Sequence, residues 1–112
     1  MPRKKIYDRW EIPYGVVQIV CAVCCDYARR DKAICNLTEE HKVLDEYKRL
    51  NGIIDDALGE IEVGVRSVMF DDIRLSRGYM CSPCSYLLAK NTYYNRKRKL
   101  IHDIAVGLNL IQ

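Results

Sequence analysis

Two pairs of cysteines have the CxxC spacing that zinc sites and redox sites use. They are Cys21/Cys24 and Cys81/Cys84. Together they could supply four thiolates to a structural zinc ion, but the chain between the pairs is much longer than the usual spacing in such sites. Cys21 and Cys24 also lie in an uninterrupted apolar segment, not in the kind of tight turn where two sulfur atoms converge. We therefore expect reduced thiols that pack as small hydrophobic residues, with no bound metal.

Few other residues could carry catalysis. A redox site at 81–84 would need a strand-to-helix setting that the sequence does not predict. The two histidines are His41, in an acidic segment, and His102, and no motif places either one beside a nucleophile. The carboxylate pairs at 55–56 and 71–72 are adjacent in sequence, so on a helix they point in different directions and do not form a shared acid/base site. Because a Gly-rich phosphate loop is also missing, we expect neither an enzyme nor a cofactor site.

A cationic segment near the C-terminal end could bind a polyanion. Four consecutive basic residues run from Arg96 to Lys99, Lys90 precedes them, and the first acidic residue after them is Asp103. Cationic side chains neutralise phosphates, and groups on the first turns of a helix can reach bases in the major groove. Charge alone is equally consistent with the solvated face of an ordinary core helix. The candidate DNA-contacting residues are Lys90, Asn91, Thr92, Tyr93, Asn95, Arg96, Lys97, Arg98 and Lys99.

A terminal helix over 91–110 would position these residues. Asn91 is a good N-cap, and no proline interrupts the segment. Apolar residues recur along it at intervals of three and four, which is typical of one buried helical stripe. The stripe consists of Tyr94, Leu100, Ile101, Ile104, Ala105 and Leu108. Such a helix would anchor in a core by its apolar face and present its basic N-terminal half to DNA.

A short helix before the terminal one would complete a helix-turn-helix. Ser82 can cap it and Pro83 favours its first position, so the pattern predicts a helix that ends at Ala89. A turn at 90–91 then leads into the basic helix. A short helix, a tight turn and a basic helix follow one another in this order in DNA-binding helix-turn-helix units.

The remaining sequence predicts three further helices. Pro13 opens the first, which covers 14–30. After a transition at 31–35, Asn36 or Thr38 can cap the second. The sequence thus predicts an all-α fold of about five helices.

An apolar stripe of nearly heptad spacing runs through 44–68. Gly59 and Gly64 interrupt it, and each costs about 1 kcal/mol relative to alanine inside a helix. We therefore expect a break near 59–63. The predicted second and third helices cover about 37–59 and about 63–75.

Size and charge narrow the classes of function. The chain has 112 residues, about half of them apolar, and this predicts one ordered domain or a small domain with an extension. Basic ends flank an acidic middle at 38–62, so only parts of the molecule would approach nucleic acid favourably. The predicted regions are a basic N-terminal arm (1–12), an N-terminal region of two helices (13–60) and a C-terminal helix-turn-helix region (61–112).

Signals for membranes and secretion are missing from the sequence. No apolar run is long enough for a membrane span, and the charged start does not lead into the apolar core of a signal peptide. We therefore expect a cytoplasmic protein with reduced cysteines and no membrane partner.

Two segments resemble a family of phage proteins. The C-terminal helix of phage-encoded transcriptional regulators of the ArpU and RinA type is similar to NTYYNRKRKLIHDIAVGLNLI, which starts at Asn91. The opening helix of related phage proteins is similar to IPYGVVQIVCAVCCDYARR, which includes the motif Asp26-Tyr27. The resemblance covers most of the chain and is strongest in the C-terminal segment. It implies a last helix-turn-helix like the promoter-reading module of sigma factors.

The basic helix predicts docking in the major groove of double-stranded DNA, and the resemblance implies that the protein is a phage or prophage transcriptional regulator in a bacterial host. Arg3, Lys4 and Lys5 would add a non-specific contact. RNA polymerase and a second copy of the chain are further partners that this hypothesis allows. The alternative is a helical structural or interaction protein whose stripe at 44–68 mediates self-association or polymerase binding, with the basic helix only solvated. A third hypothesis is a phage packaging component with the same fold.

Overall fold

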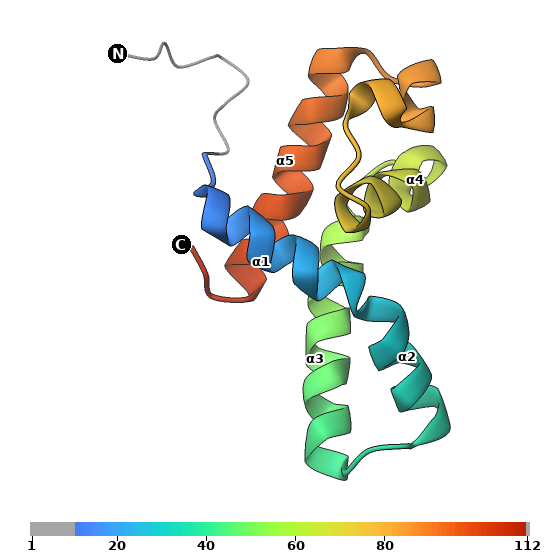
Figure 1. Cartoon of the computed structure of the whole chain (residues 1–112), viewed down its shortest axis with the longest axis vertical. Helices are drawn as coiled ribbons and strands as arrows, with labels where there is room; N and C mark the ends of the chain where they lie inside the picture. The colour runs from blue at the N-terminus through green and yellow to red at the C-terminus, as the bar shows by residue number, and fades with distance from the viewer. Residues whose placement is uncertain (1–10, 112) are drawn as a thin grey trace.

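The computed structural model describes residues 11–111, which fold into helices joined by short loops (Figure 1). The described part of the chain contains no strand, so the predicted all-α class is confirmed. Arg3, Lys4 and Lys5 of the predicted basic arm lie outside the described residues. The elements are the α-helices α1 (Tyr14–Cys25), α2 (Tyr27–Asn36), α3 (His41–Leu58), α4 (Val63–Arg74) and α5 (Lys90–Gly107), and the 3₁₀ turns η2 (Tyr79–Cys81) and η3 (Pro83–Tyr86).

α2 and the first half of α3 form a hairpin that extends away from the other helices (Figure 1). α1 packs on both α4 and α5, and α3 also contacts α5. At the end of α5, a Cβ atom on Gly107 would lie 2.5 Å from the Ile53 side chain, so glycine allows α5 to approach α3 closely. One core therefore joins residues of 13–60 and 61–112. Its buried members are Val20, Cys24, Ile54, Ala57, Ile61, Val65, Met69, Ile73, Cys84, Tyr93, Leu100, Ile101, Ile104 and Ala105.

The predicted first helix over 14–30 is in fact two helices. α1 ends at Cys25, α2 starts at Tyr27, and the predicted transition at 31–35 is helical. Pro13 is the N-cap of α1 and not its first helical residue, because its ψ of 143° is not helical.

A buried arginine accounts for the break between α1 and α2. The guanidinium of Arg30 donates to the carbonyl of Val23 at 2.6 Å, and this carbonyl at the end of α1 also accepts from the Asp26 N–H at 3.3 Å. The Nε of Arg30 also donates to Asn51 Oδ1 at 2.7 Å, and the Asn51 amide donates to the carbonyl of Tyr27 at 3.2 Å. Residues on α1, α2 and α3 are thereby linked at one point, which fixes the bend between α1 and α2.

α3 starts later than predicted, at His41, with Glu40 as its N-cap. Neither Asn36 nor Thr38 caps it, because α2 continues to Asn36 and the chain must then reverse direction. Leu37 makes this reversal in the left-handed conformation, with a φ of 51°. The residues between Leu37 and Glu40, which were predicted to start α3, therefore form the turn between α2 and α3.

The predicted break after α3 is confirmed. α3 ends at Leu58 and α4 starts at Val63. The guanidinium of Arg66 donates to the carbonyl of Ile61 at 2.9 Å, so it satisfies a backbone group within the break.

The apolar stripe at 44–68 packs against other helices of the same chain. Its members are buried or partly buried in the fold, and none of them is fully exposed. The most buried part of the stripe therefore packs within the chain, while its partly buried members keep some exposed area. The fully or nearly fully buried members are Leu44, Ile54, Ile61 and Val65.

The element before the terminal helix is not the predicted α-helix ending at Ala89 but the pair of 3₁₀ turns η2 and η3. Ser82 caps η3 as predicted, because its Oγ accepts from the N–H of Cys84 at 3.0 Å. The hydroxyl of Tyr79 donates to the carbonyl of Leu88 at 2.7 Å. This hydrogen bond pulls the end of η3 back toward η2, so the segment closes as a compact turn.

α5 confirms a terminal helix, with shifted ends. Ala89 is the N-cap, so Asn91 lies in the first turn and does not cap the helix as predicted. α5 ends at Gly107, before the predicted 110, because Asn109 adopts the left-handed conformation with a φ of 61°. The hydrogen bonds that follow are those of a Schellman motif, which terminates a helix.

Candidate nucleic-acid interface

One face of α5 is held in the core by a buried polar network. Tyr93 is fully buried, and its hydroxyl donates to Asp72 Oδ2 at 2.9 Å. Asp72 on α4 is also fully buried, and its other oxygen accepts from Arg77 Nε at 2.8 Å. The Tyr79 ring meets the Tyr93 ring edge to face, with 5.2 Å between the centroids. Burial, followed by the hydrogen bond to Asp72, raises the pKa of Tyr93 above its ordinary value.

This network corrects one of the predicted DNA contacts. Tyr93 was expected among the DNA-contacting residues, with Tyr94 in the buried stripe; instead Tyr93 is the core residue and Tyr94 is only partly buried. Two adjacent tyrosines are indistinguishable in an apolar pattern. Tyr93 is the tyrosine in the core because its hydroxyl donates to Asp72, which is 21 residues away in sequence.

Lys97 also belongs to the inner face of α5. Its Nζ donates to the backbone carbonyl of Arg77 at 2.6 Å and lies 5.6 Å from the centroid of the Tyr93 ring. Burial lowers the pKa of Lys97, because desolvation disfavours the charged amine. Lys97 is therefore directed to the loop after α4 and not to the surface where a phosphate would lie.

Two other basic residues of α5 hold carboxylates. Arg96 Nε donates to Glu62 Oε1 at 2.7 Å, and Lys99 Nζ donates to Asp103 Oδ2 at 2.7 Å. The bond from Arg96 lowers the pKa of Glu62. All four side chains remain partly exposed to solvent. Exposed ion pairs contribute only about 0–1 kcal/mol each, so such partners can be exchanged for phosphates at small cost.

The outer face of α5 carries the other predicted residues. Successive residues of an α-helix rotate by about 100°, which places this set opposite Leu100 and Ile104. Lys90 and Asn91 are exposed, and the Arg98 guanidinium carbon lies 5.7 Å from the centroid of the Tyr94 ring. We call the set the outer face of α5. It consists of Asn91, Thr92, Asn95, Arg96, Arg98 and Lys99, with Lys90 at the start of the helix; beyond Asn91 these side chains are partly buried, and Asn95 Oδ1 and Arg98 Nη1 are fully buried.

The first turn of α5 adds backbone donors to this surface. The N-cap residue, Ala89, has no side chain that could accept a hydrogen bond from the helix start. The first N–H groups of a helix have no partner within the helix, so here they are left to solvent or to an anion. Lys90 places a cation beside them.

The six cysteines occupy three kinds of place, and none forms a disulfide. Cys24 and Cys84 are fully buried. The predicted core packing of Cys24 is thereby confirmed. Cys21, predicted to be buried with it, is half-buried and lines a pocket. The exposed cysteines are Cys25, Cys35 and Cys81. Within residues 11–111, no group of three or more His, Cys, Asp or Glu side chains could hold a metal ion.

Cysteine alkylation should follow this order of exposure. Burial raises the pKa of Cys24 to about 12, so near neutral pH its thiol is protonated as well as inaccessible. We expect iodoacetamide to modify Cys35 and Cys81 in the native protein long before Cys24. Peptide mapping by mass spectrometry checks this order, with the protein unfolded in denaturant as the control. Equal labelling of Cys24 and Cys35 in the native protein would contradict the packing of α1.

Comparisons with known proteins identify no relative. No protein-family model matches the chain, and neither does any curated protein or solved structure. No helix in residues 11–111 combines the length and apolar character needed to cross a membrane. Any function must therefore be argued from the residues and their geometry.

Proposed function

We propose that this protein binds double-stranded DNA through α5, as a phage-type or prophage-type transcriptional regulator. The division of α5 into two faces carries the proposal. Its inner face is anchored through Tyr93, Leu100 and Ile104, and its outer face is cationic and rich in amide groups. A helix fixed in this way can enter the major groove with its N-terminal residues first.

The residues of α5 divide into positioning and reading groups. Lys90 and the free N–H groups of the first turn would hold one phosphate, while Arg96 and Lys99 would release their carboxylates and hold others. Asn91 and Thr92, on the first turn, would contact base edges. Most of the affinity would come from the phosphate contacts and would fall steeply with salt.

Three exposed apolar side chains on the 3₁₀ turns before α5 support protein binding as a second candidate function. Met80 on η2 is 83% exposed, and Tyr86 and Leu87 at the end of η3 are 91% and 62% exposed. Exposed apolar side chains that gather beside one element mark contact sites in many proteins. RNA polymerase bound at DNA, or another protein, could cover these side chains. DNA binding and protein binding at these two surfaces do not exclude each other.

Replacing Arg96 and Lys99 together by alanine should weaken binding to every duplex sequence. Each contact that neutralises a phosphate contributes about one unit to the slope of log K against log salt, so we expect the slope to fall by about two units. Fluorescence anisotropy with a labelled random-sequence duplex, measured over a series of salt concentrations, gives both affinity and slope.

The matched control is the double variant Lys42→Ala/Lys48→Ala. These lysines are exposed on α3, in the acidic part of the sequence, so the net charge changes equally without touching α5. The control variant should keep both the affinity and the slope of the unmodified protein to within the error. Equal affinity and slope in the α5 variant and the control would contradict docking through α5.

A further inference from the structure

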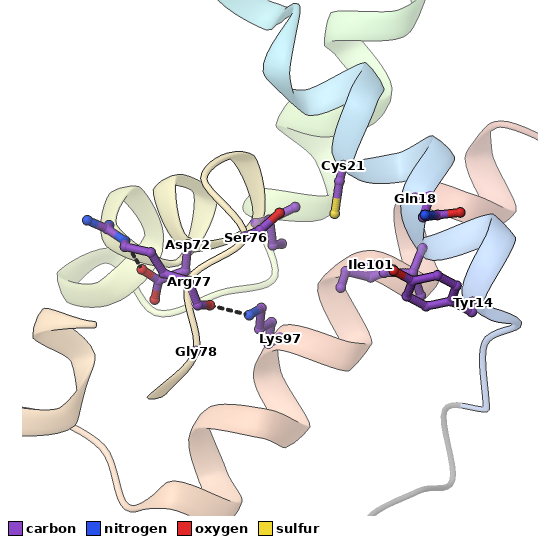
Figure 2. A pocket seen from close by; sticks show the side chains of 11 residues that line it. Tyr14, Gln18, Cys21, Asp72, Ser76, Arg77, Gly78, Lys97 and Ile101 are labelled. Carbon is purple, nitrogen blue, oxygen red and sulfur yellow. Dashed lines mark hydrogen bonds and ion pairs between the residues drawn. The ribbon is translucent and has the colours of Figure 1, made fainter. Parts of the chain in front are cut away.

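A pocket of about 580 Å³ lies between α1, the loop after α4 and the inner face of α5 (Figure 2). This volume is in the range of sites for small molecules. Val17 on α1, Ile73 on α4 and Ile101 on α5 contribute apolar wall to it. Lys97 and Cys21 reach the same space from α5 and α1 (Figure 2).

The charged groups at this pocket do not balance. Arg77 and Lys97 bring two positive charges, and Asp72 brings one negative charge. Both oxygens of Asp72 are engaged, one with Arg77 and one with the Tyr93 hydroxyl. Burial raises the pKa of the Cys21 thiol, which therefore stays neutral near neutral pH. The pocket thus carries one positive charge in excess.

Lys97 is where this excess charge lies. An ammonium group has three N–H donors, and one of them goes to the carbonyl of Arg77 at 2.6 Å. The Arg77 side chain is directed to Asp72, so it does not compete for a ligand at Lys97. Lys97 therefore retains donors for an anion at the edge of an apolar space.

We propose that this pocket binds a small monocarboxylate with an apolar body. The carboxylate would accept charge-assisted hydrogen bonds from Lys97, and one negative charge would cancel the excess positive charge. The apolar body would lie against Val17, Ile73 and Ile101. A phosphate ester fits less well, because it carries nearly two negative charges and the pocket has one positive charge in excess.

Calorimetric titration with sodium hexanoate, near neutral pH, tests this proposal. Hexanamide is the matched probe, because it has the same chain and no charge, and it should bind at least about tenfold more weakly. Inorganic phosphate is the second probe and should also bind more weakly than hexanoate. Saturable hexanoate binding with this order supports the proposal. No hexanoate binding, or binding of hexanamide or of phosphate as tight as that of hexanoate, overturns it.

The Lys97→Met variant tests whether the Lys97 amine is the group that binds the carboxylate. Methionine keeps most of the side-chain volume and removes the amine, and we expect hexanoate affinity to fall by about tenfold or more. Lys42→Met, on the distant hairpin, should leave the affinity unchanged. Equal hexanoate affinity in the Lys97→Met and Lys42→Met proteins would overturn the assignment, and the comparison of hexanoate with hexanamide needs no variant at all.

Carboxylate binding at this pocket needs no DNA. The titration therefore tests carboxylate binding whether or not α5 binds duplex DNA. The anisotropy experiment likewise tests DNA binding whether or not the pocket binds a carboxylate. The two surfaces lie on opposite faces of α5.

Discussion

Replacing Asp72 by alanine should lower the free energy of unfolding by about 3 kcal/mol. Asp72 is fully buried and accepts from Arg77 Nε at 2.8 Å and from the Tyr93 hydroxyl at 2.9 Å. Without the carboxylate, the Tyr93 hydroxyl loses its acceptor inside the core and the excess of positive charge beside Lys97 increases. Removing one partner of a buried charged network costs much more than removing an exposed one, because the other groups stay desolvated.

The neighbouring aspartate is the matched control for this change. Asp71 pairs with Arg74 at 2.9 Å, but both side chains are partly exposed to solvent. We expect Asp71→Ala to leave the denaturation midpoint nearly unchanged. Urea denaturation followed by circular dichroism compares the two variants, and equal midpoints would contradict the buried network at Asp72.

Replacing Arg30 by alanine should also cost about 3 kcal/mol of unfolding free energy. Arg30 is 3% exposed and links Val23 on α1 to Asn51 on α3. Its loss leaves the Val23 carbonyl without the guanidinium and leaves a cavity beside Asn51. The bend between α1 and α2 would loosen, and with it the attachment of the α2/α3 hairpin.

Arg29 provides the comparison at the adjacent position. Its guanidinium pairs with Asp26 at 2.5 Å, and its side chain is 56% exposed. Arg29→Ala removes the same charge and side chain, and we expect little change in the urea midpoint. Hydrogen exchange of the α2 and α3 amides gives a second readout, because protection should drop in the Arg30 variant alone. Equal protection in both variants would contradict the role of Arg30.

The two faces of α5 connect these expectations to function. The inner face depends on the network around Asp72, and this network fixes the direction of the outer face. A variant that loosens the network should therefore impair the proposed DNA binding as well, although the replaced residue would contact no phosphate. The proposed carboxylate pocket lies on the same inner face, at Lys97.

Local patterns in the sequence determined the all-α class, the break after Leu58, the terminal helix and the burial of Cys24. Each depends on residues close in the chain: apolar spacing repeats with the helical turn, and glycines weaken a helix where they stand. The same local evidence placed the terminal helix within three residues at each end.

The composition of the outer face of α5 depended on partners far away in sequence. In the sequence, the basic segment is one uniform cluster. In the structure, Lys97 donates to the backbone carbonyl of Arg77, while Arg96 donates to Glu62, which lies 34 residues earlier. In the same way, Asp72 selected Tyr93 over Tyr94 for the core. The spacing of residues in a sequence cannot predict such contacts. The type of a residue does not tell which side chains will be buried or which hydrogen-bond acceptor will lie near them.

The division of 14–30 into two helices and the 3₁₀ turns before α5 have the same origin. Arg30 and Tyr79 satisfy carbonyls of residues that lie several positions away, at Val23 and Leu88, and thereby stabilise turns that intrinsic propensities disfavour. The sequence by itself therefore determined most of the helical segments, since helix formation is mainly local, but not the helical continuation through 31–35 or the 3₁₀ turns before α5. The tertiary structure decided where the chain bends and which side chains face solvent, because those outcomes depend on buried hydrogen bonds between distant residues.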